Sequence, residues 1–175
     1  MSGPSFRAAA GLLLALIAAC RREVAEVPQP TPPPTPVPSR VVLFFPGGDG
    51  LLHGESREIA ELPDAPVPRI RLLVEELAMG SQRGWAAVYP WSVTVLGAFV
   101  DGSGNAYVDL SPPPPGAVQG SAGEAALLYA TVSTVVVNCP GIRRVQLLLD
   151  GQEVETLGHL DLSRPVAPRP EFVAP

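Results

Sequence analysis

The prolines are the feature that most constrains what this chain can fold into. Seven of its 22 prolines lie between Pro28 and Pro38, interleaved with Gln, Thr and Val. Proline lacks a backbone N–H, so this stretch cannot complete a helix or a sheet and favours an extended polyproline II conformation of about 3.1 Å per residue. We therefore expect residues 20–39 to be a spacer before a folded domain. A proline-rich ligand for a partner is the alternative.

An apolar run of 12 residues, Ala8 to Ala19, ends directly before Cys20. It is too short for the hydrocarbon core of a bilayer, which needs about 20 residues. With Arg7 at its start, it is typical of a secretory signal sequence over residues 1–19. Ile17-Ala18-Ala19-Cys20 resembles the bacterial lipobox, where the chain is cut before the cysteine and its sulfur receives a diacylglyceryl group. This predicts membrane attachment through lipid on Cys20. The alternative is an ordinary cleaved signal peptide in which this cysteine is incidental.

Composition narrows the classes of function. The formal net charge is −5, and removing residues 1–19 removes only Arg7, which gives −6. Binding to nucleic acid needs a basic stripe, so we expect no nucleic-acid partner. All 12 basic residues are Arg, which excludes lysine chemistry. With Cys20 acylated, Cys139 has no partner for an intramolecular disulfide, and we interpret it as a small buried hydrophobe.

The pattern over residues 40–163 predicts one α+β domain, followed by a disordered tail over residues 164–175. The apolar run Val41–Phe45 predicts a buried strand. A glycine-rich turn at residues 46–50 ends it, and residues 51–59 suggest a weak hairpin. Without residues 1–19 the chain has 156 residues, which is enough for one domain and not comfortably for two.

Two helices are predicted. The first covers about residues 68–79, with Glu75 and Glu76 on its solvated face. Its apolar stripe consists of Ile70, Leu73, Val74 and Leu77. The second covers residues 122–137 and is apolar around most of its circumference, so we expect it to be the central element. Ser121 and Glu124 have the spacing of a capping box at its start.

The remaining strands follow from shorter patterns. Residues 91–100 read as a strand with Val93, Val95 and Phe99 on a shared face, and residues 106–110 alternate into the returning strand. Residues 142–149 form the last long strand, and Asp150-Gly151 is typical of a two-residue hairpin turn. The order strand, helix, strand, strand, helix, strand favours a mixed sheet with two helices packed on one face.

Several segments together resemble the GerMN domain, named for the spore-germination protein GerM. They are Val42 to Leu52, Glu75 to Gly80, Ala106 to Ser111, Gly120 to Thr134, Pro140 to Gln146 and Leu149 to Ser163. The chain departs from the family pattern at Pro112 to Pro115 and at Asn138-Cys139, a loop and a helix end. The resemblance implies an extracytoplasmic, often lipid-anchored envelope module, linked in sporulating bacteria to sporulation and germination. It implies no catalytic residues.

Two loops, one rich in oxygen-bearing side chains and one rich in glycine, are candidate ligand sites. Oxygen-bearing side chains occupy alternate positions of a calcium-type loop at Asp101, Ser103, Asn105 and Asp109. However, Ala106 replaces the turn glycine and Pro112 stands where a bidentate Glu is needed, so we predict a hairpin turn and no metal site. Residues 46–50 could cradle an anion, but no phosphate-binding ending follows, and a tight turn is the better interpretation.

The candidate catalytic residues are scattered along the sequence. An envelope hydrolase would need a cleft in which two or more of a small set converge: His53, His159, Asp49, Asp161 and Ser163. We predict no catalytic residues and no cofactor, because two isolated histidines make neither a zinc site nor a triad. The aromatic residues Trp85, Tyr89 and Trp91 either form an exposed partner surface or pack into the core.

These observations predict a non-enzymatic, lipid-anchored envelope protein. Its domain would associate with another envelope protein or with itself, and the resemblance links that role to sporulation, germination or envelope assembly. The alternative is an envelope module that binds glycan or peptidoglycan, or a hydrolase. An apolar patch beside an exposed sheet edge would favour association. A concave pocket with convergent polar groups would favour a ligand.

Overall fold

The computed structural model describes residues 38–117, 120–157 and 159–175, which fall within a compact unit of residues 36–175. The predicted signal sequence, Cys20 and the spacer up to residue 37 lie outside the described residues. Within the part of the chain that is described, no helix is long and apolar enough to cross a membrane.

The domain contains two α-helices and eight strands among the described residues. The strands are β1 (Ser39–Pro46), β2 (Leu52–Ile59), β3 (Val95–Val100), β4 (Asn105–Leu110), β5 (Arg144–Leu149), β6 (Gln152–Glu153), β7 (Thr156–Leu157) and β8 (Leu160–Asp161). The helices are α1 (Pro66–Ala78), α2 (Ser121–Asn138) and a 3-10 turn, η1 (Pro170–Phe172). The predicted α+β class is confirmed.

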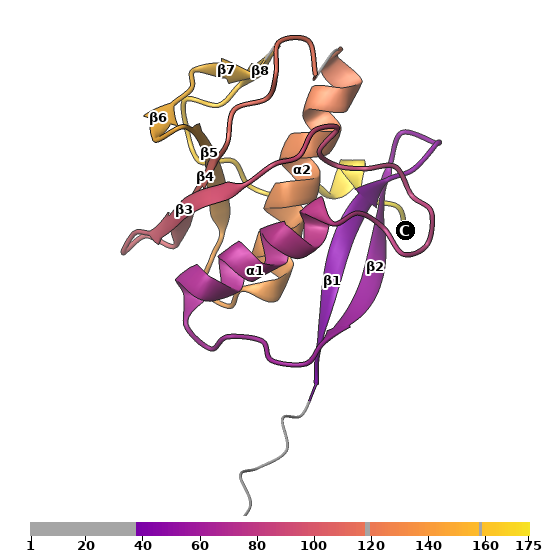
Figure 1. Ribbon diagram of the computed structural model, residues 1–175, viewed down its shortest axis with the longest axis vertical. Coiled ribbons are helices and arrows are strands. Elements are labelled where there is room, and N and C mark those ends of the chain that lie inside the picture. The colour runs from indigo at the N-terminus through magenta and orange to yellow at the C-terminus, as the bar shows by residue number, and fades with distance from the viewer. Residues whose placement is uncertain (1–37, 118–119, 158) are drawn as a thin grey trace, which may run out of the picture. The chain divides into compact units, whose positions relative to one another are not determined.

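The strands form a mixed sheet and two small antiparallel pairs. The mixed sheet has the order β3-β4-β5-β6, in which β4 and β5 are parallel and their neighbours antiparallel. The pairs β1-β2 and β7-β8 are separate sheets. Figure 1 shows α2 between the β1-β2 hairpin and the mixed sheet, and this helix contacts both β1 and β5. Helix α1 contacts β3, β1 and α2, so one core lies between the two layers of strands.

Strand β2 differs from its prediction. The sequence suggested a weak hairpin within residues 51–59, but these residues form one strand that pairs with β1 from Ser39↔Ile59 to Pro46↔Leu52. The hairpin turn is the glycine-rich segment 47–51, closed by the Gly47 N–H donating to the Leu51 carbonyl at 2.7 Å. A side chain at Gly47 would lie 2.5 Å from the His53 ring, so the turn requires glycine there. Its amides serve the turn, as the tight-turn interpretation predicted.

Both helices are stabilised by the faces that the sequence predicted. The stripe of α1 is fully buried at Ile70, Leu73, Val74 and Leu77. In α2, buried residues occupy most of the circumference, which confirms its central place. At its end, Cys139 is only 1% exposed and burial raises its thiol pKa to about 11, so it packs as a small hydrophobe.

The predicted capping box at the start of α2 is wrong. The N-cap residue is Gly120, with a φ of 80°, and no side chain caps the helix. Ser121 is the first helical residue instead. The Glu124 carboxylate is buried and accepts the His159 backbone N–H at 2.9 Å, so it does not reach back to the helix start. Glycine takes the cap position because only it adopts a positive φ without strain.

A β-bulge changes which side chains of β3 face the solvent. The strand begins at Val95, and its register with β4 shifts between Val95 and Gly97, which leaves Leu96 as the extra residue. A bulge moves the following side chains to the opposite face. Val95 is therefore buried, whereas Phe99 is 61% exposed. The prediction that these two residues share a face is wrong.

The C-terminal segment, residues 164–175, is packed against the domain, in contrast to the disordered tail that was predicted. Val166 and Val145 exchange two backbone hydrogen bonds of 2.8 and 2.9 Å. Further along, the Phe172 ring stacks on Tyr129 at 4.5 Å between centroids. The composition is rich in proline and short of long apolar runs, but these few contacts, made to distant strands and a helix, are enough to order the segment.

Candidate functional site

The solvent-facing side of the mixed sheet carries the main exposed apolar surface that we consider a candidate site. Phe99 of β3 lies opposite Tyr107 of β4, with ring centroids 5.9 Å apart. With Gly97, Ala98, Asp109 and Leu148, these rings line a shallow hollow of about 230 Å³. We call Gly97, Phe99, Tyr107 and Leu148 the outer-face patch. Contiguous exposed apolar side chains, unlike single ones, are a feature of surfaces that bind partners.

The outer-face patch lies beside an open sheet edge. Strand β3 is the terminal strand of the mixed sheet. Its first part is covered, because Arg71 of α1 donates to the carbonyls of Val95 and Leu96 at 2.7 and 3.2 Å. Further on, antiparallel pairing directs the backbone groups of Ala98 and Val100 away from β4. Among the described residues, no hydrogen bond covers these two residues on that side.

The hairpin turn at residues 101–105 holds the outer-face patch in place. The Asp101 carboxylate accepts the backbone N–H groups of Ser103 and Asn105 at 2.8 and 3.0 Å. It also accepts the Tyr107 hydroxyl at 3.3 Å. The hydrogen bond from the Asn105 backbone N–H is the main reason that the Asp101 pKa is lowered. The Asp101 oxygens that suggested a calcium loop thus serve this turn, whereas Asp109 Oδ1 accepts the Gly151 N–H at 2.9 Å. Within the described ranges, no group of three or more His, Cys, Asp and Glu side chains could hold a metal ion.

The two histidines lie in different parts of the fold, each with its own carboxylate. His53 of β2 stacks on Trp85 at 4.2 Å, and its Nε2 lies 3.0 Å from Asp49 Oδ2. His159, before β8, has its Nδ1 at 3.4 Å from the Glu124 carboxylate. This geometry does not bring the imidazoles into one site.

Two pairs from the set named for the hydrolase alternative lie together: Asp49 with His53, and Asp161 with Ser163. The Ser163 hydroxyl donates to Asp161 Oδ1 at 2.5 Å, and the Ser163 N–H donates to the same oxygen at 2.9 Å. These hydrogen bonds lower the Asp161 pKa. A serine that donates to a carboxylate, with no imidazole to take its proton, is not an activated nucleophile.

The aromatic residues after α1 mostly pack inward. Tyr89 is buried, and its hydroxyl hydrogen-bonds Thr131 of α2 at 2.7 Å. Trp85 and Trp91 are partly buried against the core. The core alternative is therefore correct for this cluster. The exposed aromatic surface lies instead on β3 and β4, where the bulge places Phe99.

Sequence reasoning missed a buried ion network at the β2–α1 contact. Arg57 donates to Glu55 Oε1 at 2.6 Å and to Glu76 Oε2 at 2.9 Å. Glu55 also accepts the Ser81 hydroxyl and the backbone N–H of Gln82. Glu76 was expected on a solvated face, but this ion pair draws it against β2. The signal was present in the sequence, since Glu55 and Arg57 share the strand face of buried Ile59 at a period of two.

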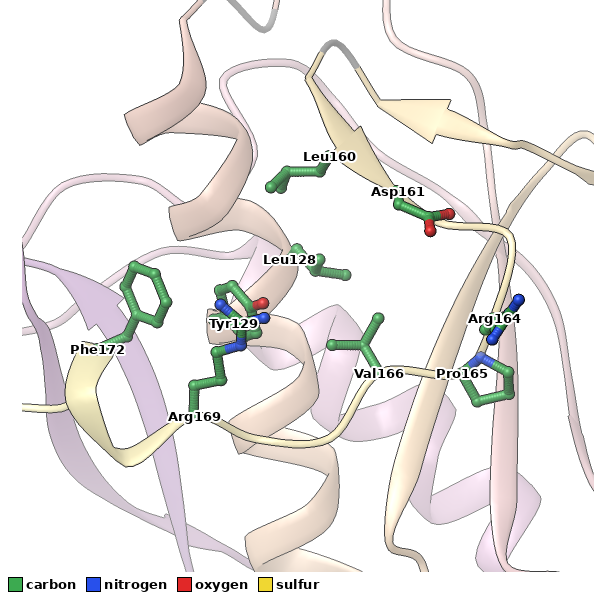
Figure 2. A pocket seen from close by; sticks show the side chains of 9 residues that line it. All are labelled: Leu128, Tyr129, Leu160, Asp161, Arg164, Pro165, Val166, Arg169 and Phe172. Carbon is green, nitrogen blue, oxygen red and sulfur yellow. The ribbon is translucent and has the colours of Figure 1, made fainter.

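A separate pocket of about 300 Å³ lies between α2, β8 and the C-terminal segment (Figure 2). Leu128 and Tyr129 come from α2, and Leu160 and Asp161 from β8. The other lining residues belong to residues 164–172, the segment that the sequence had predicted to be disordered. This pocket was therefore not predicted from the sequence.

Comparison with known proteins agrees with this geometry. The family Germane, described as “Sporulation and spore germination”, matches residues 42–155, which is more than half of the chain. The chain belongs to the Germane family. The match begins in β1 and ends after β6, so it includes the outer-face patch but not the C-terminal wall of the pocket. No curated protein sequence matches the chain.

Solved structures share the fold of this Germane domain. The first GerMN domain of GerM from Bacillus subtilis has a TM-score of 0.53 and 17% identity, over 74% of this chain and 94% of that one. The tandem GerMN domains of the same protein give 0.57 and 17%, over 75% of this chain and 46% of theirs. A Clostridium perfringens chain described as a “putative lipoprotein” gives 0.51 and 24%, over 75% and 87%. The recognised GerMN resemblance is thus confirmed.

Proposed function

We propose that this chain is a non-enzymatic, lipid-anchored protein of the cell envelope whose Germane domain binds an extended segment of another envelope protein. The observation that carries the proposal is the 61% exposed Phe99 ring beside the open part of the β3 edge. An added strand would hydrogen-bond the outward backbone groups of Ala98 and Val100. Its side chains would cover Phe99 and Tyr107, because alternate residues of an added strand face the same side as this patch.

The proposed position in the envelope rests on different residues. The apolar run before Cys20 and the spacer after it support an anchor, and the “putative lipoprotein” likeness from Clostridium perfringens agrees with it. Labelling cells with an alkyne fatty acid should mark the full chain and not the Cys20→Ala variant. Equal labelling of both would contradict lipid attachment at Cys20.

The association is tested by crosslinking in the native envelope. A photo-reactive amino acid replaces Leu96, which is 45% exposed next to the outer-face patch. We expect one specific protein adduct, lost in a Phe99→Ser variant. The matched control is Met79→Ser, since Met79 is 71% exposed on a different element, at the end of α1. An Ala98→Pro variant removes one outward N–H and should weaken the adduct too.

Each other outcome points to a named alternative. An adduct to a second copy of this chain would replace the proposed partner by self-association. An adduct that survives Phe99→Ser as well as it survives Met79→Ser would remove the outer-face patch from the interface. Peptidoglycan fragments that are released or retained by the purified chain, with no protein adduct, would favour the glycan-binding or hydrolase alternative. Circular dichroism of each variant checks that the fold is kept.

A further inference from the structure

The pocket in Figure 2 combines an apolar wall with hydrogen-bond donors that the protein itself does not use. Leu128, Leu160 and Val166 form its apolar wall, and Tyr129 also lines it. The volume of about 300 Å³ corresponds to about ten water molecules and lies at the lower limit for small-molecule sites. It therefore suits a ligand with a compact apolar body.

Tyr129 is the central residue of this pocket. It is only 4% exposed, and its ring stacks on Phe172 at 4.5 Å and 14° between planes. Its hydroxyl makes no hydrogen bond with any described residue, and it is not fully buried as Ser133 Oγ is. Because water reaches this hydroxyl, a ligand oxygen that enters the pocket would replace a water molecule as its hydrogen-bond partner. The pocket is where that partner would lie.

Two arginines add further unused donors. The Arg169 guanidinium lies over the Tyr129 ring at 5.3 Å from its centroid. Arg164 lines the pocket beside Asp161. In the part of the chain that the structure describes, neither guanidinium makes a hydrogen bond or an ion pair within 4.0 Å. Both side chains are exposed, as are Arg83 and Arg144, whose guanidiniums also lack such a partner among the described residues. What distinguishes Arg164 and Arg169 is that they line the same pocket.

One acidic residue lines the pocket, Asp161, and it lies within the electrostatic reach of Arg164. Asp161 Oδ1 accepts both the N–H and the hydroxyl of Ser163. Two guanidiniums and one carboxylate leave the lining with a formal charge of +1, in a chain whose net charge is −5. A cationic lining with donors facing an apolar wall selects an anion that carries a hydrocarbon group.

We propose that this pocket binds a small organic carboxylate with an aromatic or branched apolar body. The carboxylate accepts hydrogen bonds from Arg169 and the Tyr129 hydroxyl, and Arg164 adds to the positive field. The apolar body packs on Leu128, Leu160 and Val166. This site is independent of the outer-face patch, so either proposal stands if the other fails.

The test uses the full chain and 3-phenylpropionate as the probe, observed by saturation-transfer difference NMR. The matched neutral probe is 3-phenylpropan-1-ol, which keeps the ring and the chain length. We expect the carboxylate to bind with a Kd of about 1 mM, as its size allows. We expect the alcohol to bind about tenfold more weakly, because it cannot use a charge-assisted hydrogen bond.

Variants distinguish specific binding in this pocket from non-specific binding to the protein surface. Arg169→Gln and Tyr129→Phe should each raise the Kd of the carboxylate severalfold, and Arg169→Lys should restore part of the loss. Arg83→Gln is the control, since it removes an exposed arginine that does not line the pocket. Equal binding of acid and alcohol, or equal effects of Arg169→Gln and Arg83→Gln, would overturn the proposal. Urea denaturation confirms that each variant is folded, so loss of binding cannot reflect unfolding.

Discussion

The side-chain amide of Asn138 pairs with the backbone of Val42 as a neighbouring strand would. The Val42 N–H donates to Asn138 Oδ1 at 2.9 Å, and Asn138 Nδ2 donates to the Val42 carbonyl at 2.7 Å. Two residues further along β1, the Phe44 N–H donates to Thr134 Oγ1 at 3.1 Å. Helix α2 thus closes the edge of β1 that β2 leaves free. This explains why β1-β2 stays a separate pair and does not join the mixed sheet.

Changing Asn138 to Asp should therefore destabilise the domain. The substitution keeps the shape but replaces the donor by an oxygen that faces the carbonyls of Val42 and Thr134. We expect the free energy of unfolding in urea to fall by about 1–3 kcal/mol at pH 7. Val137→Ala, at the exposed neighbouring position, is the control and should change little. Equal stability of the Asn138→Asp variant and the native chain would show that the edge of β1 needs no such partner.

The Glu55 carboxylate should make stability depend on pH. Burial alone would raise its pKa, but hydrogen bonds from Ser81 and Arg57 outweigh this and lower the pKa below its ordinary value of 4.5. A carboxyl whose pKa is lower in the folded state stabilises that state above the unfolded pKa. The contribution is lost as the pH falls below about 4.5 and through the lowered folded pKa.

The measurement compares Glu55→Gln with Glu75→Gln, an exposed neighbour on α1, in urea at pH 7 and pH 3. We expect Glu55→Gln to cost about 3 kcal/mol at pH 7, because Arg57 then keeps only Glu76 as a charged partner. At pH 3 the cost should be smaller, because the stabilisation by the ionised carboxyl is progressively lost below the unfolded pKa of about 4.5. A cost that is the same at both pH values would mean that the charge of Glu55 does not stabilise the fold.

At the start of α2, replacing Ser121 by Ala should have almost no effect. The structure gives this serine no capping hydrogen bond, so we expect a change within about 0.5 kcal/mol. A true N-cap serine would cost about 1 kcal/mol. Gly120→Ala is the contrasting variant, because its φ of 80° strains a residue with a side chain, by about 1 kcal/mol or more. If chemical denaturation showed a larger loss of stability for Ser121→Ala than for Gly120→Ala, Ser121 would be the N-cap as the capping box predicted.

The fold could be predicted from the sequence where local pattern and tertiary structure agree. The stripe of α1 repeats at helical spacing, and the Asp150-Gly151 pair adopts the positive φ angles of 52° and 71° that its turn needs. The Asn138–Val42 pair could not be predicted, because it joins residues 96 positions apart. The bulge at Leu96 was equally hidden. It places Phe99 on the surface although its residue type and spacing indicate the core.

The pocket could not be predicted, because its wall is a segment without strong local preferences. Residues 164–175 contain several prolines and no long apolar run. Contacts with β5, β2 and α2 hold this segment in place. The same argument gives the last prediction. A chain that ends after Ser163 should lose the two Val145–Val166 hydrogen bonds, the Ala174 N–H bond to the Leu52 carbonyl and the stacking on Tyr129.

We expect this truncation to lower the free energy of unfolding by about 3 kcal/mol, from three backbone hydrogen bonds and one aromatic pair. A disordered tail would contribute nothing, so its removal would leave the stability unchanged within about 0.5 kcal/mol. Phe172→Ala in the full chain isolates the aromatic part and should account for about 1 kcal/mol of the loss. Hydrogen exchange at the Val145 amide gives a local readout, because its acceptor is the Val166 carbonyl. Unchanged protection of that amide after truncation would show that the C-terminal segment does not pair with β5 in solution.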